Sequence, residues 1–175
     1  MKKTIAYLAC VWFAAAGVVT AQDPLWVEPM LSRGTQTMSF SGRIDDDGND
    51  VGAALGLSYG RFIFDCVEAG MSTSLGFRGS DSKNASLGVY GTYYFDLGTL
   101  VVPHAGVGMD FSYWDVGAGD DTVAEFLGYT GAKYFLRNHL ALGSELVLRA
   151  ATDDVYNLGE DSFDWLIRFF TSWYF

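Results

Sequence analysis

Apolar and polar positions alternate along most of this chain, from about residue 35 to its end. The last segment shows the pattern most clearly, because its charges fall on one face while the other carries Trp165, Ile167, Phe169, Thr171, Trp173 and Phe175. A period of two is typical of a β-strand whose two faces lie in different environments. Eight segments share it: 35–43, 51–62, 66–78, 86–95, 101–111, 122–135, 140–150 and 164–175.

The length of these segments indicates what surrounds them. Each is close to the about 9–11 residues with which a tilted strand crosses a bilayer. A closed barrel satisfies its backbone groups inside lipid and leaves no edge, so the last strand can end bare by pairing with the first. The sequence therefore predicts an all-β fold, an eight-stranded antiparallel up-and-down transmembrane β-barrel in residues 35–175.

The polar faces carry five cations and five anions, which such a barrel would enclose. Buried charges are usually paired and hydrogen-bonded, and an eight-stranded barrel has room for side chains rather than for a wide channel. We therefore predict a structural network of ion pairs, with a functional lumen as the alternative. A soluble, lipocalin-like barrel would show the reverse pattern, with the apolar set inside. The predicted network comprises Arg43, Glu68, Arg78, Asp110, Glu125, Lys133, Glu145, Arg149, Asp164 and Arg168.

The connections between segments alternate in length, as they do in transmembrane barrels. The short ones are 62–65, 96–99 and 136–139, and the long ones are 44–50, 79–85, 112–121 and 152–161. The long set holds twelve acidic residues and one lysine, so most of the formal net charge of −10 is expected on one rim. Aromatic residues are expected at the two membrane–water interfaces. They are Phe111, Tyr113 and Trp114 near the long loops, and Phe62, Phe95, Tyr134, Trp173 and Phe175 near the short turns.

The N-terminus predicts export. Two lysines, an apolar run and small residues before Ala21 are typical of a secretory signal peptide, residues 1–21. The alternatives are a membrane anchor, since the run 5–21 reaches the short limit for a spanning helix, and a lipoprotein signal at Cys10. Residues 22–34 would form a periplasmic lead, in which two prolines argue against regular structure. Cys66 is expected as a packed residue near a strand end.

These features together resemble the small outer-membrane β-barrels of the OmpA/OmpX type. The stretches VPHAGVGMDF and TGAKYFLRNHLALGSELVLR look like the fifth strand and the sixth-to-seventh hairpin of that family. The resemblance implies a Gram-negative-type outer membrane and contact with lipopolysaccharide. It is not expected to extend to the peptidoglycan-binding domain of larger members, because the chain ends with the predicted barrel. It also implies a C-terminal signal read by the barrel-assembly machinery. That signal would be Ile167, Phe169, Thr171, Trp173 and Phe175, with Thr171 as a departure.

Some barrels of this size are lipid A deacylases that use a histidine two residues before a serine. His104 is followed by Ala105-Gly106 and His139 by Leu140-Ala141, so neither offers that spacing, and we expect a lumen and a turn position for them. The acidic stretch 45–50 lacks the full ligand series of a calcium loop.

The function predicted is that of a non-enzymatic, monomeric envelope protein, without cofactor, metal or nucleic-acid partner. It would serve envelope structure or surface contact through its acidic loops. The alternatives are a narrow porin-like channel and a lipid A-modifying enzyme.

Overall fold

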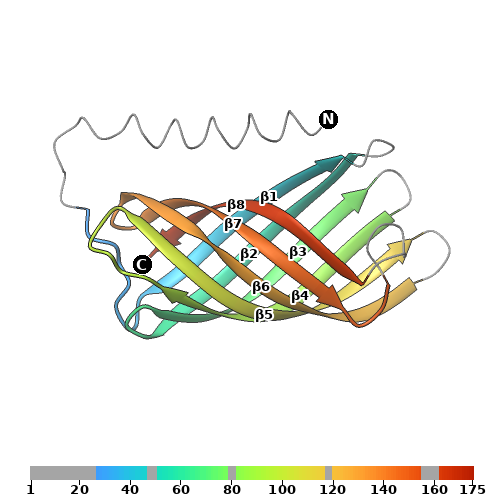
Figure 1. The fold of residues 1–175 in the computed structure, drawn as a ribbon, viewed down its shortest axis with the longest axis horizontal. Coiled ribbons are helices and arrows are strands. Elements are labelled where there is room, and N and C mark those ends of the chain that lie inside the picture. The colour runs from blue at the N-terminus through green and yellow to red at the C-terminus, as the bar shows by residue number, and fades with distance from the viewer. Residues whose placement is uncertain (1–26, 47–50, 79–81, 117–119, 155–161) are drawn as a thin grey trace.

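The chain forms a closed antiparallel barrel in which each strand pairs with its neighbours in sequence (Figure 1). The computed structural model describes residues 27–46, 51–78, 82–116, 120–154 and 162–175. The predicted eight-stranded, up-and-down fold is confirmed. Its strands are β1 (Gln36–Asp46), β2 (Val51–Phe64), β3 (Val67–Arg78), β4 (Ser82–Tyr94), β5 (Val101–Val116), β6 (Asp120–Arg137), β7 (Leu140–Ala151) and β8 (Phe163–Tyr174).

The strands extend beyond the predicted limits at the long-loop end. β5 and β6 stay paired as far as Asp115 opposite Asp120, within the predicted loop 112–121. β4 likewise begins at Ser82 and β1 continues to Asp46, so the predicted loops 79–85 and 44–50 were too long. The backbone ladder needs only paired N–H and C=O groups and continues where the apolar alternation has ended.

Inside the barrel, large rings face glycines on the neighbouring strand. A Cβ atom at such a glycine would collide with the facing ring, so the missing side chain makes room for it. This explains why the inward positions alternate between very small and large residues, as a narrow barrel requires. The pairs are Tyr90 with Gly70, Tyr129 with Gly106, and Phe170 with Gly143.

The short-turn end of the barrel is filled by an apolar cluster, which we term the apolar floor. The prediction for Phe62 was wrong, since its ring is only 1% exposed and packs 5.3 Å from the Tyr94 ring instead of lying at the membrane interface. Phe62 shares the inward parity of Ser58 and Gly60 on β2, and the sheet's alternation therefore turns it into the lumen. The floor comprises Leu31, Phe62, Tyr94, Val102, Phe135, Ala141 and Tyr174.

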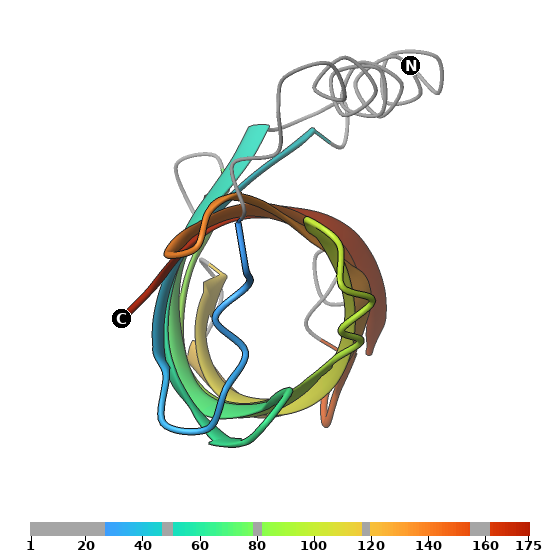
Figure 2. The ribbon, with the colours of Figure 1, turned by 90° about the vertical axis from the view of Figure 1, so that its left-hand side faces the viewer.

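The segment that precedes β1 lies across the same end of the barrel. In Figure 2 it runs in blue across the ring of strands. Residues 27–31 form no helix or strand, and Leu31 inserts its side chain into the apolar floor. Its carbonyl accepts a hydrogen bond of 2.8 Å from the Cys66 amide, and the Gly34 amide donates one of 2.8 Å to Phe62. Gly34 (φ +96°) and Cys66 (φ +62°) adopt left-handed backbone conformations that let the two turns meet.

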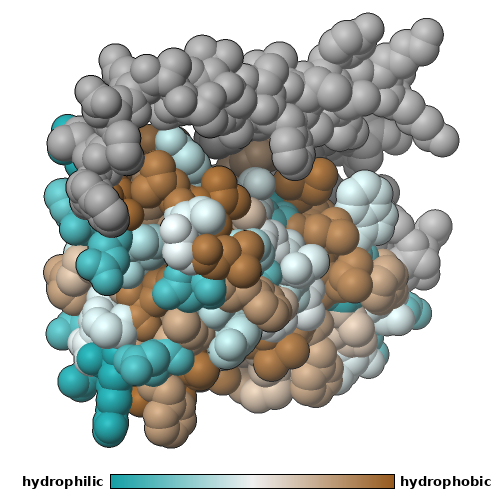
Figure 3. All heavy atoms as spheres, turned by 60° about the vertical axis from the view of Figure 1, so that its left-hand side comes forward, coloured by the Kyte–Doolittle hydropathy of each residue, from teal (hydrophilic) through white to brown (hydrophobic). Residues whose placement is uncertain are grey.

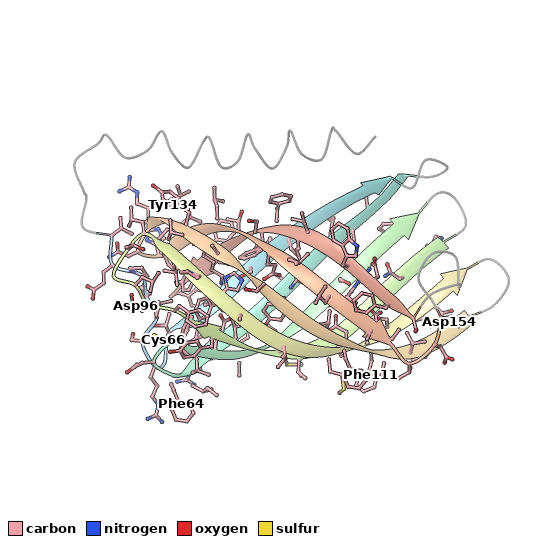
Figure 4. All side chains as sticks on the ribbon, viewed as in Figure 1. Phe64, Cys66, Asp96, Phe111, Tyr134 and Asp154 are labelled. Atoms are coloured by element: carbon pink, nitrogen blue, oxygen red, sulfur yellow. The ribbon has the colours of Figure 1, made fainter. Side chains whose placement is uncertain are left out.

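The outer wall exposes large apolar side chains from every strand. Leu55, Val107 and Trp165 are 69%, 68% and 60% exposed. Apolar residues cover much of the visible wall in Figure 3, and Phe64 and Phe111 point outward in Figure 4. Among the described residues, no helix is long and apolar enough to cross a membrane. A wall this apolar is stable only if another apolar phase, such as lipid, covers it.

Most of the predicted interface aromatics do lie on this outer wall. Phe95, Phe111, Tyr113, Trp173 and Phe175 are exposed, and Tyr134 is half-buried. The side chain of Trp114 lies outside the described part of the chain.

Candidate functional site: the barrel lumen

Directly above the apolar floor, Glu68 and Lys133 form the most deeply buried charged layer. Their exposed fractions are 2% and 4%. The Lys133 ammonium donates to the hydroxyls of Tyr94 at 2.7 Å and Tyr174 at 3.0 Å, and the Tyr94 hydroxyl in turn donates to Glu68. Tyr94 therefore bridges a buried cation and a buried anion that compensate each other.

Rings and hydroxyls complete this layer. The Lys133 ammonium lies 4.8 Å from the centroid of the Tyr94 ring, and 5.3 Å from those of Phe170 and Tyr174. Glu68 also accepts hydrogen bonds from Tyr90, at 2.7 Å, and from Thr37. Cation–π contacts and several donors on one carboxylate offset the cost of removing both charges from water.

A second layer is built on Glu145. His104 Nε2 lies 3.0 Å from one carboxylate oxygen, and the Arg168 guanidinium forms an ion pair with the other. Glu145 and Arg168 face each other across β7 and β8, which places their side chains side by side. Both His104 and Glu145 are buried, whereas Arg168 is about one-third exposed.

A third layer lies nearer the long loops. Arg149 pairs with Asp164 across β7 and β8 and lies 3.8 Å from Glu125 on β6, so it joins three strands. Asp110 faces Glu125 across β5 and β6 and accepts a 3.3 Å hydrogen bond from Ser72. Two carboxylates directly opposite each other repel, and Arg149 compensates one of them.

The structure places eight of the ten charges predicted for the lumen on the inner wall. They are Glu68, Asp110, Glu125, Lys133, Glu145, Arg149, Asp164 and Arg168. The side chains of Arg43 and Arg78 lie outside the described residues. His104 faces the lumen and His139 lies in the β6–β7 turn, as expected. The tyrosine hydroxyls of this network are not among the predicted residues, although Tyr90, Tyr94 and Tyr174 share the inward parity of their strands.

A cavity of about 160 Å³ occupies the lumen between two chemically different walls. The wall from β5 to β8 carries the charges described above except Glu68, which lies on β3. The wall from β1 to β4 is lined largely by small hydroxyl-bearing residues: Ser39, Ser41, Ser58, Ser72, Ser74 and Ser86. Of the apolar floor, only Tyr94 borders this cavity, which therefore ends at the floor toward the short turns.

The described residues offer little for catalysis. His104 is already paired with the Glu145 carboxylate. Its ring centroid lies 5.8–6.5 Å from those of Tyr94, Tyr129 and Phe170, so aromatic rings enclose the imidazole. Cys66 lies in a turn, where burial and then the carboxylates of Asp96 and Asp65 raise the pKa of its thiol, which disfavours a nucleophilic thiolate. No group of three or more His, Cys, Asp or Glu side chains in the described ranges is arranged to hold a metal ion.

The residues of the predicted assembly signal lie on the lipid-facing side of β8. Ile167, Phe169, Trp173 and Phe175 are exposed and Thr171 is half-buried. Phe175 exchanges two backbone hydrogen bonds with Gln36, of 2.8 and 3.0 Å, so the C-terminal residue takes part in closing the barrel.

Comparison with known proteins gives similarity of structure without similarity of sequence. No protein-family model matches the chain, and no curated protein matches its sequence. Neisserial surface protein A is similar with a TM-score of 0.60 and 16% identity over 81% of this chain and 96% of that chain. The N-terminal β-barrel domain of Pseudomonas aeruginosa OprF gives 0.58 and 15%, over 82% and 98%. P. aeruginosa outer membrane protein OprG gives 0.53 and 13%, over 82% and 97%. The chain therefore has the fold of the small outer-membrane β-barrels, as its sequence predicted.

Proposed function

We propose that this chain is a non-enzymatic, integral outer-membrane protein of a Gram-negative-type cell, in which a closed barrel holds acidic loops at the cell surface. One observation carries the proposal: charges are paired inside the barrel while large apolar side chains cover its outer wall. This arrangement is stable in a bilayer and unstable in water. The bilayer and lipopolysaccharide are the partners proposed for the wall, and the protein is proposed to act as a monomer.

The second candidate is a narrow channel, and the polar lumen cavity is what favours it. The apolar floor argues against it, because Phe62, Val102, Phe135 and Ala141 are at most 1% exposed at the short-turn end. An ion would have to leave water to pass them. We therefore propose that the barrel serves as an anchor and that ions do not cross it.

The test is to refold the purified chain into phospholipid vesicles. We expect different gel mobilities for heated and unheated samples, quenching of tryptophan fluorescence by brominated lipids, and no single-channel conductance. Recovery as a soluble protein would overturn the membrane assignment. Steady conductance would favour the channel, and altered lipid A masses in cells that produce the protein would favour the enzyme.

We also propose that residues 1–21 direct export and that the C-terminal strand is recognised during assembly. N-terminal sequencing of the membrane-inserted protein should then begin at Gln22.

Deletion of Phe175 should lower outer-membrane levels sharply in cells, while the same variant refolds in detergent almost normally. The Phe175 ring is 56% exposed and contributes only part of the burial of a core aromatic. Equal losses of folded barrel in cells and in detergent would assign Phe175 a structural role alone.

A further inference from the structure

The barrel is closed unevenly, and the weak place is the boundary between β1 and β8. The ladder there runs only from Thr37 opposite Tyr174 to Gly42 opposite Phe169. β7 and β8, by contrast, stay paired from Leu140 opposite Trp173 to Ala150 opposite Phe163. Beyond Gly42 and Phe169, β1 pairs only with β2 and β8 only with β7 among the described residues. Figure 1 shows β1 and β8 diverging toward the long-loop end, and we term this gap the seam.

The backbone groups along the seam have no strand partner across the gap. Phe175 exchanges both of its hydrogen bonds with Gln36, so every second residue of β8 directs its N–H and C=O toward β1. Continued upward, this places the groups of Ile167, Trp165 and Phe163 at the seam. The Trp165 amide instead donates to the Asp164 carboxylate at 2.7 Å. The Asp164 side chain thus satisfies an amide that has no partner on β1.

The sequence gives a physical reason for the ladder to stop where it does. If the register continued by one step, Arg43 would face Arg168 across the two strands. Like charges directly opposite each other destabilise a strand pair. Gly42, the last paired residue of β1, has no side chain that would strengthen the contact, and an added Cβ there would meet no atom within 4 Å.

The lumen cavity lies directly behind the seam. Gly42 on one side and Leu166 and Arg168 on the other all line it, so the same gap borders the cavity and the lipid-facing wall. Outward of the seam lie Phe40, Trp165 and Ile167, which are 49%, 60% and 41% exposed. The seam therefore lies between a polar cavity and the apolar phase around the barrel.

We propose that the seam and the cavity form a binding site for a single-chain amphiphile with a neutral, hydroxyl-bearing head. The alkyl chain lies in the bilayer and passes through the seam, and the head occupies the lumen cavity. This inference rests on the proposed location of the barrel in a membrane.

The head chemistry follows from the two walls of the cavity. Among the described side chains, the cations nearest the seam are already paired, Arg168 with Glu145 and Arg149 with Asp164, and so offer little to an anionic head. The carboxylates of these pairs are neutralised in turn and offer little to a cationic head. Asp110, which also lines the cavity, already accepts a hydrogen bond from Ser72. The opposite wall presents the serine hydroxyls, which bind other hydroxyl groups as donor or acceptor. Backbone groups at the seam add further donors and acceptors for the polar part of the chain.

The test uses a reporter in the lumen of the full-length chain. In a background with Cys10→Ser and Cys66→Ser, a Ser58→Cys variant is labelled with bimane and refolded into vesicles. Three amphiphiles with the same chain, brominated next to the head, are then added: a monoacylglycerol, a fatty acid and an alkyltrimethylammonium. We expect saturable quenching by the monoacylglycerol, and about fivefold or more weaker binding of the other two, the size of one or two lost hydrogen bonds.

A cysteine pair then tests the route. Ile44→Cys with Ile167→Cys, oxidised to a disulfide, continues the β1–β8 register across the seam. Phe40→Cys with Thr171→Cys links the same strands where they are already paired and is the matched control. We expect the first disulfide to abolish quenching and the second to leave it unchanged.

Three results would overturn the proposal. Quenching that persists with the seam locked would mean that nothing enters through it. Stronger quenching by the fatty acid or the ammonium compound would contradict the head chemistry. Absence of saturable quenching by any of the three would remove the site. Gel mobility and tryptophan quenching by brominated phospholipid are measured on the same vesicles, so failure of membrane insertion is recognised separately.

Discussion

The two halves of this barrel solve the problem of a narrow lumen in different ways. At the short-turn end, the lumen is packed solid by the apolar floor, the lead residue Leu31 and the Glu68–Lys133 layer. Toward the long loops, serines make up much of the described lining from β1 to β4, a cavity remains, and β1 separates from β8. One end therefore closes the barrel and stabilises it, whereas the other leaves space that a ligand can use.

This contrast indicates that the pairing of strands and the filling of the lumen depend on each other. Where large inward rings meet glycines across the ladder, the wall is closed on all sides. Where the small residue Gly42 ends the pairing of β1 with β8, the ladder stops.

Amide hydrogen exchange in lipid vesicles should divide β8 into two parts. The amides of Phe169 and Thr171 point toward paired positions of β1, whereas that of Ile167 points into the seam. We expect Ile167 to exchange about a thousandfold faster than Phe169 and Thr171, because a ladder amide exchanges only when the structure opens at a cost of several kcal/mol. Equal protection of all three would mean that β1 and β8 pair along their full length in a bilayer.

Lys133→Met should be the most destabilising of the single charge removals. It leaves Glu68, which is 2% exposed, without the cation that it reaches through Tyr94. We expect the free energy of unfolding, from urea titrations in vesicles, to fall by about 3–5 kcal/mol. Lys83→Met, at an exposed position of β4, is the control and should change it by less than about 0.5 kcal/mol.

The same charge removal in the open half sharpens the comparison. Arg149→Leu removes the guanidinium that pairs with Asp164 and Glu125. Asp164 is about one-third exposed. We expect a loss of about 3 kcal/mol, at the lower limit for breaking a buried pair, since water reaches part of the cluster. A loss as large as that of Lys133→Met would show that the two halves are equally dry. An increase in conductance without loss of stability would show that this pair restricts a pore.

Leu31→Ala tests whether the lead contributes to the closed end. Leu31 is 5% exposed within the apolar floor, and its removal should cost about 2–3 kcal/mol. It should also increase the reaction rate of Cys66 with a maleimide. The Cys66 amide donates to the Leu31 carbonyl, and the Cys66 side chain packs against the apolar floor. Leu55→Ala on the outer wall, 69% exposed, is the control that leaves the thiol unaffected. Unchanged stability and thiol reactivity would place the lead outside the fold in solution.

Arg43→Asp should give the smallest change, in the opposite direction. With the register continued, the new carboxylate would face Arg168 and turn a like-charge pair into an attractive one. We expect the barrel to gain about 0.5–1 kcal/mol, the value of a favourable cross-strand pair, and the exchange of Ile167 to slow. A loss of stability would indicate that Arg43 is needed where it stands, and the repulsion would then not explain the seam.

The strands, their inward faces and the closed topology follow from the pattern of residues along the chain. Period-two alternation is a local property, so it identified Glu125 and Lys133 as inward even in the least regular segment, 122–135. It also identified Ile167, Trp173 and Phe175 as outward, because the alternation within each strand separates the residues that face the lumen from those that face outward.

Which inward groups meet, and where the wall is incomplete, depends on contacts between distant strands. Alternation gives Phe62 an inward side, but its place in the floor depends on Tyr94 from another hairpin and on Leu31 from a segment without any periodicity. The bridge from Lys133 through Tyr94 to Glu68 joins three strands whose register no local pattern contains. The early end of the β1–β8 ladder likewise depends on the first and last strands meeting, and the resulting opposition of Arg43 and Arg168 arises only when the barrel closes.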